Sequence, residues 1–302
     1  MDDPEIFGGP CLRLLSDPAA ASILIHLRQA PAPTRDLLEL GTGLGYPTLM
    51  SRVRLLAKHR LVDRGTEVHL LTAGRAALSV IDVAAAREGE WPTDRDRFML
   101  PGTRALSVAC DSRWRAISRV LAHEPARIRD LEKLLPRLAK GTLERRLRQR
   151  REDGLLTAEK GGRDVWHGLS EHGRRLAGLG LHATRWEWVF GQRDKGLLSS
   201  DLSGIVHQLA PLVCVSDGIQ GVCLFREHWH RTIDRDVYLA VRDCRVLPYV
   251  VAPLASPDAV AHGTPHEWAQ ALVTGDWTNI KCDGESGLIR ALVRGLHKEI
   301  RA

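Results

Sequence analysis

Basic and hydroxyl side chains recur at helical spacing in two segments of the sequence, a combination suited to binding DNA. The clearer segment is a helix predicted from Pro47 to about His59, because Leu49, Val53 and Leu56 fall on one face. Such a helix fits the major groove, where outer side chains reach base edges and basic groups hold phosphates. The outer-face candidates are Tyr46, Thr48, Ser51, Arg52, Arg54 and Lys58 in this segment, Lys140, Thr142, Arg145, Arg146, Arg148 and Arg151 in the second, and Lys160 and Arg163 on a following hairpin. A solvated basic face or a protein-interaction module would show the same pattern.

A glycine-rich stretch precedes the first of these helices and suggests a different chemistry. Residues 38–46 resemble the cofactor loop of S-adenosylmethionine-dependent methyltransferases, with glycine at positions 41, 43 and 45. Such a loop requires a preceding strand inside a doubly wound sheet. Residues 34–38 instead follow Pro33 with helical spacing, and no run of apolar strands comes after them. We therefore interpret the glycines as a turn into the helix and keep a methyltransferase as the alternative function.

Metal-binding and catalytic patterns are sparse in the sequence. His228 and His230 would share one face of a strand near Cys223, which could chelate an ion, but strand alternation alone explains their spacing. The sequence contains no nucleophile elbow, paired-carboxylate motif or phosphate loop. We expect no enzyme activity, no cofactor and no metal site.

Charge is unevenly distributed along the 302 residues. Lys and Arg exceed Asp and Glu by 20 to 13 in residues 89–183, whereas the flanking thirds are nearly balanced. A local excess of this kind is expected of a surface that meets phosphate. The six cysteines form no C-x-x-C pair, the first residues are acidic, and no stretch is apolar enough to span a membrane. We therefore expect a cytoplasmic protein that does not bind membranes.

An internal repeat organises the first two thirds of the chain. A shift of 94 residues aligns both apolar and basic positions without a gap over about 40 residues. The aligned pairs include Ile23 with Ile117, Arg35-Asp36-Leu37 with Arg129-Asp130-Leu131, Arg52 with Arg146, and Arg54 with Arg148. One pair conflicts, because the apolar Leu56 aligns with Arg150. Either the Arg150 side chain extends towards solvent, out of the seam, which is the packed apolar side of the third helix, or the register slips by one residue there.

Each copy is predicted to contain helix, helix, helix, hairpin and a further helix. In the first copy, Ser16-Asp17-Pro18 begins the first helix, Thr34 to Leu40 form a short second helix, and Thr72 caps the helix after the hairpin. One motif, at residues 54–64, covers the end of the third helix. The other, Leu71-Thr72-Ala73-Gly74-Arg75, follows the hairpin. Both motifs, and their counterparts in the second copy at residues 150–156 and 169–174, resemble winged helix-turn-helix domains of the HxlR and MarR type. The resemblance covers about 160 residues and implies a duplicated DNA-binding module.

The last third of the sequence has a different pattern and carries most of the aromatic residues. Strands are predicted at 221–229, 236–242, 246–252 and about 277–281, and helices at 202–212, 265–274 and 285–300. Residues 257–288 resemble the end of sterol-carrier-protein-like domains, which implies a pocket for a small apolar ligand. The aromatic candidates to line it are Phe225, Trp229, Tyr238 and Trp268. A dimerisation or plain packing domain is the alternative.

These observations predict an α+β chain with winged helix-turn-helix domains at residues 1–88 and 89–183, the latter including a linker. A C-terminal α+β domain with a small mixed or antiparallel sheet would follow at residues 184–302. The expected function is DNA-binding transcriptional regulation, controlled by an apolar ligand in the last domain. Double-stranded DNA is the expected partner, and the chain could also form a homodimer. A winged-helix protein-interaction scaffold is a further alternative.

Overall fold

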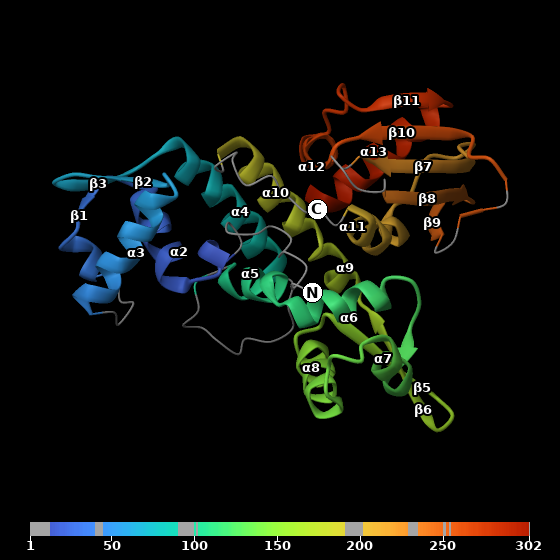
Figure 1. Ribbon diagram of the computed structural model, residues 1–302, viewed down its shortest axis with the longest axis horizontal. Coiled ribbons are helices and arrows are strands. Elements are labelled where there is room, and N and C mark those ends of the chain that lie inside the picture. The colour runs from blue at the N-terminus through green and yellow to red at the C-terminus, as the bar shows by residue number, and fades with distance from the viewer. Residues whose placement is uncertain are drawn as a thin grey trace.

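The computed structural model describes residues 13–39, 45–89, 100, 102–190, 202–228, 235–249, 252–253 and 255–301. The chain is α+β, and its described residues form three small sheets (Figure 1). No helix among these residues is long and apolar enough to cross a membrane.

The first module contains three short helical segments, a hairpin and a long helix. Its elements are α2 (Pro18–Leu27), β1 (Ala32–Pro33), η1 (Asp36–Glu39), α3 (Tyr46–Lys58), β2 (Val62–Arg64), β3 (Glu67–Leu70) and α4 (Thr72–Gly89). The strands form an antiparallel sheet in the order β1-β3-β2. The predicted second helix, Thr34 to Leu40, is reduced to the 3-10 turn η1, because Pro33 and the glycines bracket a segment too short for a stable α-helix.

The second module repeats this arrangement. After α5 (Thr103–Cys110) it contains α6 (Ser112–Leu121), β4 (Ala126–Arg127), α7 (Ile128–Leu134), α8 (Lys140–Glu152), β5 (Leu156–Gly161), β6 (Asp164–Leu169), α9 (Glu171–Arg175) and α10 (Gly178–Phe190). Helices α2 and α6, and α3 and α8, begin and end 94 residues apart, and the sheet order β4-β6-β5 matches β1-β3-β2. The 94-residue shift found in the sequence therefore also relates these helices.

The motif that follows the hairpin contains an equivalent glycine in each copy, and packing explains why. Gly74 and Gly173 lie in the helices that follow the two hairpins, and both pack against the carbonyl oxygen of an equivalent leucine. An added Cβ would lie 2.2 Å from the oxygen of Leu61 at the first position and 2.1 Å from that of Leu155 at the second. A side chain at either position would push the helix away from the end of the third helix.

The C-terminal domain consists of a mixed sheet with helices on one face. Its elements are α11 (Leu202–Leu209), η2 (Ala210–Leu212), β7 (Gly221–Glu227), β8 (Arg235–Arg242), β9 (Arg245–Tyr249), β10 (Ala259–Gly263), α12 (Pro265–Thr274), β11 (Lys281–Gly284) and α13 (Ser286–Arg301). The sheet order is β11-β10-β7-β8-β9, with β10 parallel to β7 and the other pairs antiparallel. Alternate residues of β7 and β8 face α11, α12 and α13 and form the domain core.

Three features of this domain differ from the sequence prediction, and the first is strand β10, which the sequence did not predict. The strand predicted at about 277–281 begins later, at Lys281, because Asp276 accepts hydrogen bonds from the amide and hydroxyl groups of Thr278 and forms a turn. Helix α10 spans the predicted domain boundary at residue 184. Trp186 of α10 belongs to the core of the first two modules, whereas Leu181 belongs to the core of the C-terminal domain.

Candidate nucleic-acid interface

Helix α3 presents a polar outer face, as its sequence periodicity predicts. Leu49, Val53 and Leu56 are buried against the first module. The side chains on the other side are exposed, and they are Tyr46, Thr48, Ser51, Arg54 and Lys58. Tyr46 stands at the beginning of the helix with 54% of its surface exposed. This face combines a ring, two hydroxyls and two cations, which are groups able to contact base edges and phosphates.

Helix α8 presents a denser basic face at the equivalent place in the second module. Lys140, Arg145, Arg148 and Arg151 are exposed, and Thr142 is half-buried. Gly141, Arg145, Arg148, Gln149 and Glu152 line a shallow hollow on this face. The four exposed cations share this face with exposed Glu144 and Glu152, so the face of α8 carries more cations than that of α3 but the same net charge of +2.

The side chains of Arg52 and Arg146 do not lie on these outer faces but pair with aspartates. The Arg52 side chain, 36% exposed, pairs with Asp17 at 2.5 Å between nitrogen and carboxylate oxygen. The equivalent Arg146, 20% exposed, pairs with Asp111 at 3.2 Å. The same contact thus occurs in both copies, and it directs the two guanidinium groups towards the beginning of the first helix of each module.

The two aspartates connect these arginines to the first helix of each module. The Asp17 carboxylate accepts hydrogen bonds from the amides of Ala19 and Ala20 and caps α2. Asp111 caps α6 through the amide of Arg113. Because each carboxylate holds a helix N-terminus and an arginine of the third helix together, the pair fixes where the third helix crosses the first. Sequence reasoning missed this role, although the repeat places both members of each pair at matching positions.

Arg150 is buried in the seam of the second module, so neither predicted alternative holds. Its register matches Leu56, and only 4% of the residue is exposed. The guanidinium donates to Asp153 at 2.8 Å and to Asp111 at 3.2 Å, and it lies 5.8 Å from the ring of Trp114. Arg104 of α5 completes the cluster by donating to the other oxygen of Asp153. Paired carboxylates and an aromatic face replace the water that the buried charge loses.

The hairpin of the second module is longer and carries the predicted cations. Lys160 and Arg163 are exposed near its turn, where Gly162 adopts a positive φ of 64°. Asp164, at the start of β6, accepts hydrogen bonds from Arg127 at 3.3 Å and Arg129 at 3.1 Å, which tie the turn end of the hairpin to the start of α7.

A second aspartate strengthens this tie. Arg127 also donates to Asp130 at 2.7 Å. That hydrogen bond lowers the pKa of the Asp130 carboxyl below its usual value. The hairpin is therefore held beside α7 by a network of charges that the sequence alone did not reveal.

The aromatic candidates of the C-terminal domain do not converge on one cavity. Phe225 and Trp268 are fully buried and stack with ring centroids 4.6 Å apart, and the Trp268 indole donates to the carbonyl of Arg226. Tyr238 pairs with Leu224 across the sheet and lies on the opposite face, because neighbouring strand residues alternate. Trp229 lies outside the described residues.

The other predicted chemical patterns have simple structural settings. Gly45 is the N-cap of α3, and the segment described before the glycines ends in the 3-10 turn η1 instead of a strand, while residues 40–44 lie outside the description. His228 stacks on His262 at 5.3 Å, and His230 lies outside the described residues. Within the described part of the chain, no three His, Cys, Asp or Glu side chains could hold a metal ion.

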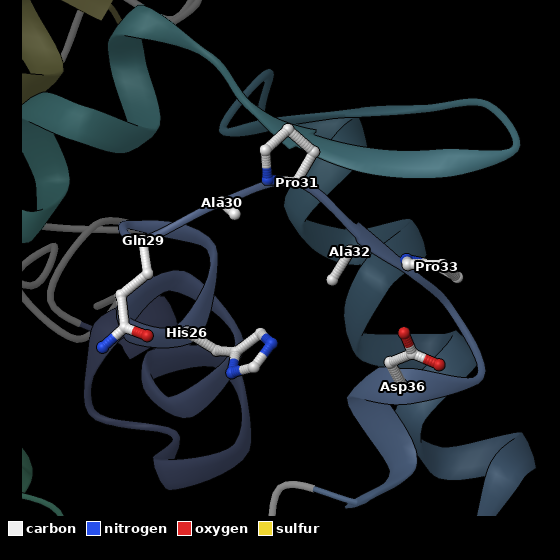
Figure 2. A pocket seen from close by; sticks show the side chains of 7 residues that line it. All are labelled: His26, Gln29, Ala30, Pro31, Ala32, Pro33 and Asp36. Atoms are coloured by element: carbon white, nitrogen blue, oxygen red, sulfur yellow. The ribbon is translucent and has the colours of Figure 1, made fainter.

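A hollow of about 360 Å³ lies beside the first module's sheet. Figure 2 shows His26 of α2 and Asp36 of η1 on opposite sides of it, with the segment from Ala30 to Pro33 between them. None of the predicted DNA-contacting side chains lines this hollow.

Comparison with known proteins gives no assignment. No protein-family model matches the chain, and no curated protein sequence matches it significantly.

Proposed function

We propose that this chain is a cytoplasmic DNA-binding transcriptional regulator with winged helix-turn-helix modules in tandem. The observation that carries the proposal is the repeated third helix. In both copies it has a buried apolar side, a polar and basic outer side, and an aspartate–arginine pair that fixes it on the first helix. Order of elements and sheet order agree with the winged-helix resemblance in each copy.

Electrostatics favours DNA as the partner over a protein. The outer face of α8 carries Lys140, Arg145, Arg148 and Arg151 beside Glu144 and Glu152, and the adjacent hairpin adds Lys160 and Arg163. Arginine and lysine along a helix and its neighbouring hairpin match a phosphate backbone, which supplies most of the sequence-independent affinity for DNA.

The stacked Phe225 and Trp268 fill the C-terminal core, which favours a packing role for that domain over a ligand-binding role.

Salt dependence of DNA binding tests the proposal. Replacing Arg145, Arg148 and Arg151 together by Ala should reduce the slope of log affinity against log salt by about 2 to 3 units, since each neutralised phosphate contributes about 0.9. The matched control replaces Arg294, Lys298 and Arg301, which are exposed on α13. It removes the same charge and should leave the slope unchanged. Equal slopes for both variants, or no DNA binding by the wild type, would reject the proposal, and calorimetry with S-adenosylmethionine tests the methyltransferase alternative.

A further inference from the structure

The two modules share one hydrophobic core. A continuous cluster of buried side chains runs from Leu14 in the first module to Trp186 in α10. Helix α4 packs against both α5 and α10. The Trp186 indole, buried in this contact, donates to the carbonyl of Ala73 at the start of α4 at 2.8 Å. In the second copy α9 and α10 together occupy the span equivalent to α4. Equivalent helical segments of the two copies, α4 and α10, therefore pack on each other within one chain.

The start of α5 is fixed against α4. The Glu88 carboxylate of α4 accepts hydrogen bonds from the amides of Gly102 at 2.8 Å and Ala105 at 3.4 Å. Gly102 has a φ of 88°, and a Cβ there would lie 2.7 Å from the carbonyl oxygen of Ile81. Only glycine accommodates this close approach without strain. The second module thus begins at a fixed position on the first.

The end of α13 makes a third connection. Arg87 of α4 donates to the carbonyls of Glu299 at 3.0 Å and Ile300 at 2.8 Å, and Arg175 of α9 pairs with the Glu299 carboxylate at 3.3 Å. A cation at a helix C-terminus stabilises the partial negative charge there. Elements of the first module, the second module and the C-terminal domain therefore meet at this point.

Contacts of this kind, between equivalent helices of two copies, are what an isologous dimer uses. Here they are formed inside a single chain. Figure 1 shows α3 and α8 well apart on the paired modules and away from the C-terminal sheet. Their separation is set by the shared core and not by a flexible tether.

From these observations, and resting on the proposed function, we propose that one chain binds one DNA duplex through α3 and α8 together, at two unlike half-sites with fixed spacing. The half-sites are unlike because the outer faces differ. Tyr46, Thr48 and Ser51 give α3 groups that discriminate bases, whereas Arg145 and Arg148 give α8 mainly phosphate contacts. The partner is therefore an asymmetric duplex site bound by a monomer.

The test uses the full chain and a duplex selected from a random-sequence library. Mass photometry should show one chain per duplex. Truncating the duplex just before the segment expected beneath α8 should lower the affinity on the order of 100-fold, because the phosphates that α8 contacts are then absent. On a flexible tether, α8 could still reach phosphates on the other side of the first half-site, and the truncation would cost little affinity.

Two variants identify which helix occupies which half-site. Thr48, Ser51 and Arg54 changed together to Ala should abolish the preference at one half-site, and the Arg145, Arg148 and Arg151 variant should weaken binding without changing the preference. Two chains per duplex, a palindromic selected site, or an unchanged affinity for the truncated duplex would overturn this inference while leaving DNA binding intact. Selection of no duplex at all would reject the proposed function, and the inference with it.

Discussion

Asp17 and Asp111 occupy equivalent positions in the two modules and offer a matched pair of substitutions. Both cap the first helix, and both pair with an arginine of the third helix. They differ in what surrounds the pair. The apolar Leu56 lies in the seam of the first module, whereas the second has Arg150, which donates to Asp111.

The expected cost of each Asp-to-Ala change follows from these contacts. Loss of the helix cap costs about 1 kcal/mol in each module. The Arg52 pair is partly exposed and adds at most about 1 kcal/mol. In the second module, the Arg150 side chain is only 5% exposed and keeps Asp153 as its one carboxylate partner. Breaking a buried pair costs about 3 to 5 kcal/mol, and the remaining partner places this site at the lower end. Because the cap and the arginine pair of the third helix occur in both modules, their costs cancel, and we expect Asp111→Ala to destabilise by about 3 kcal/mol more than Asp17→Ala.

Urea unfolding at neutral pH, followed by far-ultraviolet circular dichroism, measures the difference. The corresponding Asn variants serve as controls, because Asn retains the cap and removes the charge. Asp111→Asn should still be clearly destabilising, and Asp17→Asn should be nearly neutral. Equal losses for the two Ala variants would show that the buried cluster around Arg150 contributes nothing beyond the cap, and the reasoning would be wrong.

Three further predictions concern packing within and between the domains. Burial lowers the pKa of His182 to about 4 from 6.5. The unfolded chain therefore binds the proton more tightly, and stability should fall by up to about 3 kcal/mol as the pH drops from 6.5 towards 4. Urea midpoints should reveal this loss in the wild type and a smaller one in His182→Gln. Gly74→Ala and Gly173→Ala should each raise the unfolded fraction strongly, whereas Gly287→Ala should not, because the space around Gly287 is open. Thermal melts measure this, and a melting temperature lowered more by Gly287→Ala than by the other two changes would contradict the prediction. Arg87→Met should cost about 2 kcal/mol by leaving buried carbonyls without a donor, and an unchanged melting temperature would contradict that role.

The regular helices could be predicted from the sequence because their signals are local. Apolar periodicity and capping residues placed α3 within one residue of its observed bounds, and the repeat gave the position of α8 from it. Strand β10 could not be found this way. Its five residues pair in parallel with β7 across a long connection, and a segment that short carries no pattern that distinguishes it from a loop.

For the candidate site, the sequence could predict only which helix face each side chain lies on. Periodicity identifies an outer face, but it does not show which of its side chains reaches a neighbouring helix. Arg52 and Arg146 were assigned to the DNA face on that basis, and the structure directs them to Asp17 and Asp111. The sequence showed that Arg150 aligns with the apolar Leu56, but it did not show how a buried arginine could be stabilised there. That depends on the tertiary structure, in which the ends of three helices bring carboxylates to the same place.

The most direct test of the central proposal is a hydroxyl-radical footprint of the full chain on a selected duplex. Binding through α3 and α8 predicts two protected segments, separated by the same spacing in every selected site. Replacing Thr48, Ser51 and Arg54 by Ala should remove protection of one segment, and replacing Arg145, Arg148 and Arg151 should remove protection of the other. Protection that is unaffected by both sets of substitutions would contradict the assignment of these helices as the DNA-binding surface.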